Sequence, residues 1–213
     1  MIDTILFDLD GTLIDTNELI IKTFEHVFEN HLTQFKLSRT DYIKFIGPTL
    51  KESFLRYTND LVEVDYLVAA YRKKSLEIHD DFAVAFEGAY ELLSDLEQKG
   101  YQLGIVSSKM SEMVKRGLLV SGLDKFFKVI IGSDDVINHK PDKEPIEKAL
   151  SCFLNVKGAI YVGDHPNDIY AGKNARIKTC GVSFSLHKES LVSANADYYI
   201  DTLLELKEVL KHV

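Results

Sequence analysis

Carboxylates at the ends of two apolar runs are the residues of this chain best suited to chemistry. Asp8 and Asp10 follow the first apolar run, and Asp164 and Asp168 follow a much later one. Carboxylates gathered in one place raise each other's pKa values unless a cation lies among them. A hard divalent metal suits such oxygen ligands, and Mg²⁺ fits a site that also holds phosphate. Asp8 is then both a metal ligand and a candidate nucleophile, because a carboxylate can attack phosphorus to give an aspartyl-phosphate.

Hydroxyl and ammonium groups lie in comparable positions elsewhere in the chain. Ser107, Ser108 and Lys109 follow a second apolar run, and Lys140 follows a third after a loop, next to Pro141. Phosphoryl transfer depends mainly on positioning and on stabilising the charge of three equatorial oxygens. Hydroxyl and ammonium groups provide that stabilisation, so these residues complete a set that indicates phosphate chemistry.

The elements that would bring these residues together alternate between strand and helix. Short apolar runs predict strands at Thr4–Asp8, Tyr101–Val106, Phe126–Ile131, Ala159–Val162, Gly181–Phe184 and Tyr198–Ile200. Helical periodicity is found at Ala89–Gln98, Ser111–Val120, Pro145–Phe153 and Leu203–Leu210. This alternation predicts an α/β fold with a Rossmann-like three-layer core, in which helices cover both faces of a parallel sheet. Ligands of such sheets bind beyond the carboxyl ends of the strands, which is where the polar residues lie.

One region interrupts the alternation. Between the first two strands the chain shows only helical patterns, such as Glu18–Glu29 and Leu61–Ile78. This region is too long for an ordinary connection, so we predict an inserted all-helical cap with hinges near Asp15–Asn17 and Asp80–Val84. The expected division is a core domain of residues 1–15 and 82–213 and a cap domain of residues 16–81.

The composition argues against several classes of protein. The chain has 213 residues, with 25 Lys and Arg against 33 Asp and Glu, and a formal net charge of −8. An acidic chain without a basic block argues against nucleic-acid binding. No apolar stretch approaches the ~18 residues of a membrane helix, and the N-terminus does not resemble a signal peptide. We expect a cytoplasmic protein, in which Cys152 and Cys180 are reduced core thiols.

Taken in order, the motifs of this chain resemble those of the haloacid dehalogenase-like phosphohydrolases. The resemblance covers the whole chain, including the helical insert after the first motif. The motifs are Asp8-Leu-Asp10-Gly11-Thr12-Leu13, a serine that ends the second strand, Lys140-Pro141 and Gly163-Asp164-(x)₃-Asp168. Within the family, Phe45–Leu50 and Ser107–Lys109 resemble the phosphoglycolate phosphatase branch. The segments Asp8–Ile20 and Tyr71–Asp81 look closest to its bacterial inorganic pyrophosphatases.

The resemblance implies a Mg²⁺-dependent phosphohydrolase that acts through an aspartyl-phosphate on a small phosphorylated metabolite or on pyrophosphate. It gives Asp8 the roles of nucleophile and metal ligand. Asp10 would act as a general acid and then as a general base, and its backbone carbonyl would bind the metal. Asp164 would bind the metal directly, and Asp168 would hold it through water.

The resemblance also implies which residues bind the transferred phosphoryl group. Ser107 would donate a hydrogen bond to it, helped by backbone N–H groups near Asp10, Gly11 and Ser108. Lys140 would neutralise charge on the phosphoryl group and on the nucleophile. Lys109 is a further candidate for binding the charge of the substrate.

Other functions stay open on these residues. A sugar phosphomutase of the same fold would need the cap to hold a second phosphate, and no decisive cap motif shows this. A metal-free dehalogenase would have no use for Asp10, Asp164 and Asp168. A non-enzymatic phospho-acceptor signalling domain has a similar acidic pocket, but it would not need the inserted cap. The mutase and the signalling domain are kept as alternatives, and either a monomer or a homodimer fits the sequence.

The remaining polar residues are weaker candidates. Arg72-Lys73-Lys74 is expected to be a solvated helix face. His165 stands after Asp164 where relatives often carry a small hydroxylated residue. The histidines expected in loops or in solvent, rather than as metal ligands, are His79, His139 and His165. The cap positions considered for contact with the leaving group are Asn17, Thr49 and Lys51.

Overall fold

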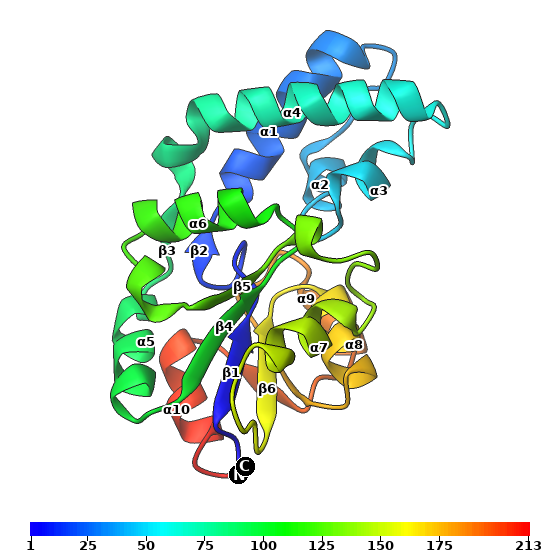
Figure 1. The fold of residues 1–213 in the computed structure, drawn as a ribbon. Helices are drawn as coiled ribbons and strands as arrows, with labels where there is room; N and C mark the ends of the chain where they lie inside the picture. The colour runs from blue at the N-terminus through cyan, green and yellow to red at the C-terminus, as the bar shows by residue number, and fades with distance from the viewer.

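A computed structural model describes residues 1–213, in which a six-stranded parallel sheet lies at the centre (Figure 1). The strand order is β5-β4-β1-β6-β7-β8. The strands are β1 Thr4–Phe7, β4 Gln102–Val106, β5 Val129–Ile131, β6 Ala159–Gly163, β7 Lys178–Val182 and β8 Tyr198–Ile200. The first strand lies between β4 and β6 and is parallel to both, which confirms the predicted α/β fold. This order brings the strands that carry the first, second and fourth motifs side by side.

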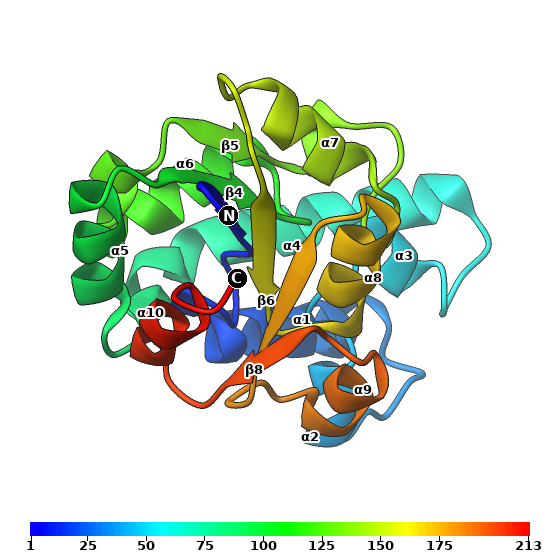
Figure 2. The same ribbon diagram turned by 90° about the horizontal axis from the view of Figure 1, so that it is seen from below.

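Side chains alternate along each strand and enter two hydrophobic layers, one on each face of the sheet. In β1, Ile5 and Phe7 belong to one layer and Leu6 belongs to the other. The helices on the first face are α5 (Ala89–Gln98), α6 (Ser111–Val120) and α10 (Leu206–Val209). Those on the second face are α7 (Glu144–Ser151) and α8 (Pro166–Asn174), with α9 (Lys188–Ser193) packed beside α8. Figure 2 shows both helix layers with the sheet between them.

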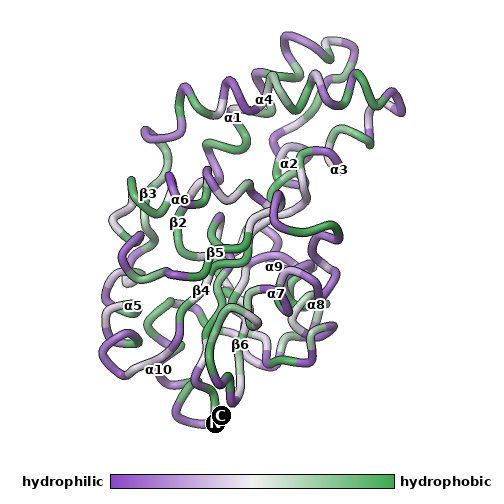
Figure 3. The backbone as a smooth tube through the Cα atoms, in the orientation of Figure 1, coloured by the Kyte–Doolittle hydropathy of each residue, from purple (hydrophilic) through white to green (hydrophobic).

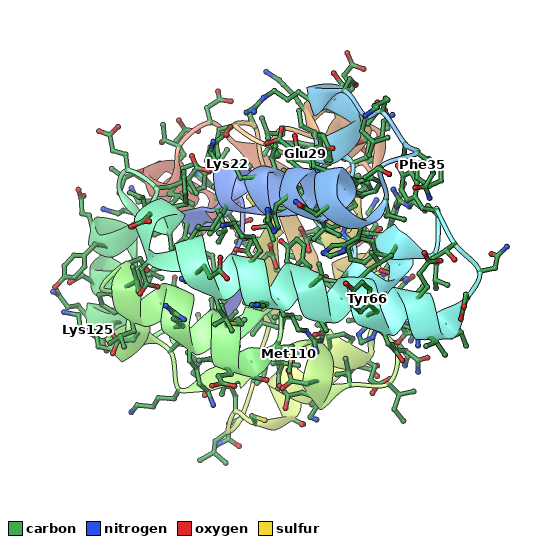
Figure 4. The ribbon with its side chains drawn as sticks, turned by 90° about the horizontal axis from the view of Figure 1, so that it is seen from above. Lys22, Glu29, Phe35, Tyr66, Met110 and Lys125 are labelled. Atoms are coloured by element: carbon green, nitrogen blue, oxygen red, sulfur yellow. The ribbon has the colours of Figure 1, made fainter.

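Between β1 and β4 the chain forms a separate helical layer beyond the carboxyl ends of the strands (Figure 1). Its helices are α1 Asn17–His31, α2 Arg39–Ile43, α3 Leu50–Phe54 and α4 Leu61–Phe82. They share a hydrophobic cluster of their own, in which Phe24 stacks on Phe45 with ring centroids 4.4 Å apart. Aromatic pairs contribute about 0.5–1.5 kcal/mol each beyond the burial of their area. Seen from above, α1 and α4 lie side by side (Figure 4).

Two very short strands connect the helical layer to the sheet. β2 (Ile14–Asp15) and β3 (Val84–Ala85) pair antiparallel, one in each chain segment that passes between the layers. They lie at the expected hinge positions, although no strand is predicted there. A strand of two residues has no periodicity to detect, so its partner decides its conformation. Helix α4 ends at Phe82, one residue beyond the expected limit of the cap.

Several element boundaries differ from those expected. No strand starts at Phe126, because Asp124–Phe126 is a 3₁₀ helix and β5 begins only at Val129. Phe126 and Phe127 are nevertheless buried. An apolar run predicts that its side chains are buried, but it does not determine whether the backbone is a strand. β7 begins at Lys178, where a polar residue conceals the start of the strand. The C-terminal segment is a 3₁₀ turn followed by the short α10, not one continuous helix.

The hydropathy of the chain follows these layers, with apolar residues gathered along the sheet and polar ones on the outer helices (Figure 3). Cys180 is buried, as expected, but Cys152 is exposed, so the prediction of two core thiols is wrong for Cys152. Cys152 directly follows α7, at an end of the helix that faces solvent. None of the helices is long and apolar enough to cross a lipid bilayer.

Candidate active site

Three carboxylates gather at the carboxyl ends of β1 and β6. Asp8 directly follows β1, Asp164 directly follows β6, and Asp168 lies in the first turn of α8. One oxygen of each lies within 4.8 Å of the others, and all three residues are buried. Phe7 pairs with Val162 in the sheet, which places the residues that follow these two strands next to each other.

The ammonium group of Lys140 lies within this cluster. Its Nζ donates to Oδ1 of Asp8 at 2.8 Å and to Oδ1 of Asp168 at 2.6 Å, and its side chain is 4% exposed. Burial disfavours the charged form, but attraction to Asp168 and Asp8 outweighs it, so the pKa of Lys140 lies well above its usual value. The structure thus places a permanent positive charge beside the candidate nucleophile.

One ammonium group leaves much of the negative charge of three buried carboxylates without a partner. Burial raises the pKa of Asp8 to about 7 against the attraction of Lys140, and repulsion from Asp168 adds to the rise. Burial and repulsion from Asp168 also raise the pKa of Asp164 well above its usual value. A divalent cation among these oxygens would compensate their charge, so the donor set fits Mg²⁺ or a similar hard ion.

The raised pKa of Asp8 predicts how stability changes with pH in the absence of metal. Its pKa is about 7 in the folded protein against an ordinary value of 3.8, so the folded state binds more protons between these values. The free energy of unfolding in EDTA should therefore fall as the pH rises through this window, and Mg²⁺ should restore it at the upper end. Urea unfolding at about pH 5 and about pH 7.5, with EDTA or Mg²⁺, measures this. A midpoint in EDTA that is higher at the upper pH would contradict the prediction.

Asp10 lies outside the group of three carboxylates that could hold a metal ion. Its Oδ1 accepts hydrogen bonds from Nζ of Lys109 at 2.6 Å and from the hydroxyl of Thr16. Lys109 follows β4, and Thr16 is the residue before α1, so Asp10 connects the sheet to the helical layer. Thr16 is not among the candidates from the sequence, because a threonine before a helix is typical of an ordinary N-cap. Its side chain makes no cap hydrogen bond here.

Ser107 is buried at the end of β4, where its backbone N–H donates to the carbonyl of Ile131 at 2.9 Å. Its Oγ accepts a hydrogen bond from the N–H of Lys109 at 3.2 Å. That contact uses a lone pair and leaves the hydroxyl hydrogen available for an anion. Ser108 is half-buried beside it and lines the same cavity.

The backbone of Gly11 forms a turn beside Asp164. Its N–H donates to the carbonyl of Ile14 at 2.9 Å, so it is not available to a phosphoryl group in this conformation. The residue has a φ of +80°, and a Cβ here would lie 2.5 Å from Oδ2 of Asp164. Glycine is required because a side chain would displace that carboxylate.

A cavity of about 710 Å³ lies between these groups and the helical layer. On the side of the sheet, the polar residues that line the cavity include Asp8, Asp10, Ser107, Ser108 and Lys109. Its polar lining from the helical layer includes Thr49, Lys51 and Arg72, whereas Asn17 does not line it. Arg72 is exposed, as expected for a solvated helix face, but it also lines this cavity.

The histidines differ from one another in their surroundings. His79 is fully buried in α4, with Nδ1 2.9 Å from Oδ1 of Asp80, so the expectation of a loop or solvent position is wrong. The helical pattern seen in the sequence stops just before it, which conceals its burial. His165 is half-buried and caps α8, and its Nδ1 accepts from the N–H of Asn167. His139 is half-buried and lines the cavity.

Comparison with known proteins agrees with this geometry. Residues 5–182 match the family model of the haloacid dehalogenase-like hydrolases. "Pyrophosphatase PpaX" of Listeria monocytogenes is 45% identical over 212 residues, which are 99% of this chain and 97% of that protein. The protein of the same name from Halalkalibacterium halodurans is 43% identical over 98% of this chain and 97% of its own length. A solved haloacid dehalogenase-like family protein from Streptococcus pneumoniae superposes with a TM-score of 0.86, at 25% identity and over 98% of each chain. The chain therefore belongs to the haloacid dehalogenase-like hydrolase family, and it is a phosphohydrolase.

Proposed function

We propose that this enzyme hydrolyses inorganic pyrophosphate, with Asp8 as the nucleophile and Mg²⁺ as the cofactor. The observation that carries the chemistry is the buried carboxylate of Asp8, which lines the cavity and accepts from Lys140 at 2.8 Å. The relatives named as pyrophosphatases support the choice of substrate, because the similarity extends over nearly the whole of each chain.

The residues divide the first half-reaction among themselves. An oxygen of Asp8 bonds to phosphorus, and the bond from phosphorus to the bridging oxygen breaks and leaves its electron pair on that oxygen. Lys140 positions Asp8, and its positive charge stabilises the negative charge of the transferring phosphoryl group. The Ser107 hydroxyl donates a hydrogen bond to an oxygen of that phosphoryl group. Asp8, Asp164 and Asp168 would hold Mg²⁺, which when bound neutralises charge on the phosphoryl oxygens.

Asp10 is the proposed acid and base. It would protonate the leaving oxygen in the first step and then take a proton from the water that attacks the aspartyl-phosphate. Lys109 and Thr16 occupy its Oδ1 in this structure. Its Oδ2 accepts no hydrogen bond, so that oxygen is the one available to exchange a proton with the substrate and with water.

We also propose that residues 16–81 act as a cap domain over the cavity. Their separate hydrophobic cluster and the two-stranded connection at β2 and β3 support movement of this unit as one body. Closure would exclude water while the aspartyl-phosphate forms. The cavity lies between this unit and the sheet, so closure would also reduce its volume.

A phosphomonoester with an organic leaving group is the second candidate substrate. Cavities of about 300–1,000 Å³ accommodate drug-sized ligands, and this one, at about 710 Å³, is within that range. Its wall includes the apolar side chains of Val68 and Leu76 from α4, and of Met110 and Met113 at the start of α6. Pyrophosphate has no apolar surface to place against them.

Phosphate release tests the proposal when pyrophosphate, 2-phosphoglycolate, sugar phosphates and a nitrophenyl phosphate are offered side by side, with Mg²⁺ or with EDTA. We expect the highest kcat/KM for pyrophosphate, and a loss of at least about a hundredfold in EDTA. A higher value for a phosphomonoester would favour the second candidate, and release that EDTA does not change would contradict the role of the metal. Transfer of phosphate between sugar hydroxyls would indicate a mutase. A long-lived aspartyl-phosphate without turnover would indicate a signalling domain.

A further inference from the structure

A buried tyrosine hydroxyl beside the nucleophile has no part in the chemistry assigned above. Tyr161 lies in the middle of β6 and is fully buried. Its hydroxyl accepts a hydrogen bond from Nζ of Lys140 at 3.0 Å and donates to the carbonyl of Val106 at 2.7 Å. The same oxygen lies 3.2 Å from Oδ1 of Asp168. This one phenol therefore contacts Lys140 and Asp168, from the third and fourth motifs, and the residue that precedes Ser107 of the second motif.

These contacts complete the surroundings of the Lys140 ammonium group. An ammonium group has three N–H donors. The oxygens within 3.0 Å of Nζ belong to Asp8, Asp168 and Tyr161, while the carbonyl of Val106 is more distant, at 3.4 Å. Each N–H therefore has one near acceptor, and the hydroxyl of Tyr161 sets the direction of the third. Since the three N–H bonds have a fixed geometry, this contact also orients the N–H that points to Asp8.

The apolar surroundings of the ring do not explain a hydroxyl at this position. Tyr161 packs in a hydrophobic layer with Leu6, Ile146 and Ala149. A phenylalanine ring would pack equally well against these side chains. The ring itself lies 5.6 Å from Nζ of Lys140, measured to its centroid, and phenylalanine would keep that contact.

We propose that Tyr161 is a positioning residue, whose hydroxyl holds Lys140 in the orientation that supports attack by Asp8. The inference rests on the proposed function, because it gives Lys140 a role in the transfer of the phosphoryl group. A displaced ammonium group stabilises the charge of the transition state less well. The bound substrate depends less on this ammonium group than the transition state does. The affinity for substrate should therefore change less than the rate of the chemical step.

Tyr161→Phe tests the inference, with whichever of the offered substrates the wild-type enzyme hydrolyses. We expect kcat to fall roughly tenfold to a hundredfold, and KM to change by less than about threefold. Orthovanadate, an analogue of the transferring phosphoryl group, should bind the variant more weakly by a similar factor. Orthophosphate should bind the variant and the wild type about equally. Tyr198→Phe is the matched control, because it removes the hydroxyl of a partly buried tyrosine on β8, away from Lys140.

Each outcome decides the question. Wild-type kcat and vanadate affinity in Tyr161→Phe would overturn the inference. A loss of phosphate affinity by the same factor as the loss of vanadate affinity, together with a lower melting temperature, would also overturn it, because it would indicate a purely structural role. A wild-type enzyme that releases no phosphate would overturn the proposed function, and this inference with it. An active wild type with an equally active variant would overturn the role of Tyr161 alone.

Discussion

Replacing Asp8 with asparagine is expected to abolish turnover and to stabilise the metal-free fold. Asparagine keeps the shape of the side chain and an oxygen that can accept from Lys140, but its amide does not attack phosphorus. Loss of a nucleophile lowers kcat by on the order of 10⁴-fold or more. The substitution also removes a buried carboxylate whose pKa is raised to about 7, so the free energy of unfolding in EDTA should rise at neutral pH. A variant that is inactive and yet more stable is difficult to explain by damage to the fold.

The measurements for Asp8→Asn are phosphate release, rapid-quench labelling of the enzyme from labelled substrate, and urea unfolding in EDTA. No label should remain on the variant, whereas the wild type should carry it transiently. Asp81→Asn is the matched control, because Asp81 is an exposed carboxylate in α4 outside the cluster. Asp8→Asn with more than about a hundredth of wild-type activity would contradict the assignment of the nucleophile.

Replacing Lys140 with methionine is expected to remove both activity and stability. Methionine matches the length of the aliphatic stem but leaves Asp8, Asp164 and Asp168 buried without a cation. Removing one partner of a buried ion pair typically costs about 3–5 kcal/mol of unfolding free energy. The kcat should fall by at least about a thousandfold, because the charge on the transferring oxygens loses its ammonium partner. Urea unfolding and phosphate release measure the two effects separately.

The dependence on pH and metal distinguishes this electrostatic explanation from a simple packing defect in Lys140→Met. At about pH 5 more of the carboxyl groups are protonated, so the loss of stability in EDTA should be smaller there than at neutral pH. Mg²⁺ should recover part of the stability but not the activity. Lys143→Met is the control, because the ion pair of Lys143 with Glu147 is exposed, and its loss should cost less than about 1 kcal/mol. A Lys140→Met protein as stable as wild type in EDTA at neutral pH would rule out the charge compensation described here.

Local patterns were sufficient for the α/β fold because strands and helices differ in hydrophobic period. Helices α5 and α6 have the expected limits, Ala89–Gln98 and Ser111–Val120. The patterns failed where burial and conformation diverge, as at Phe126, which is buried within a 3₁₀ helix. They also failed where a strand is too short to have a period, as at β2 and β3.

The sequence by itself determined which chemical groups stand at the strand ends, since an apolar run followed by a carboxylate or hydroxyl can be read locally. Only the tertiary structure decided which of these groups touch. It placed Lys140 between Asp8 and Asp168, paired Lys109 with Asp10, and committed the N–H of Gly11 to a turn. It also placed Thr16 against Asp10 and Tyr161 against Lys140, and nothing in the sequence around these two residues predicts those contacts. The physical reason is that these contacts depend on strand order and side-chain direction, which arise from packing between segments far apart in the chain.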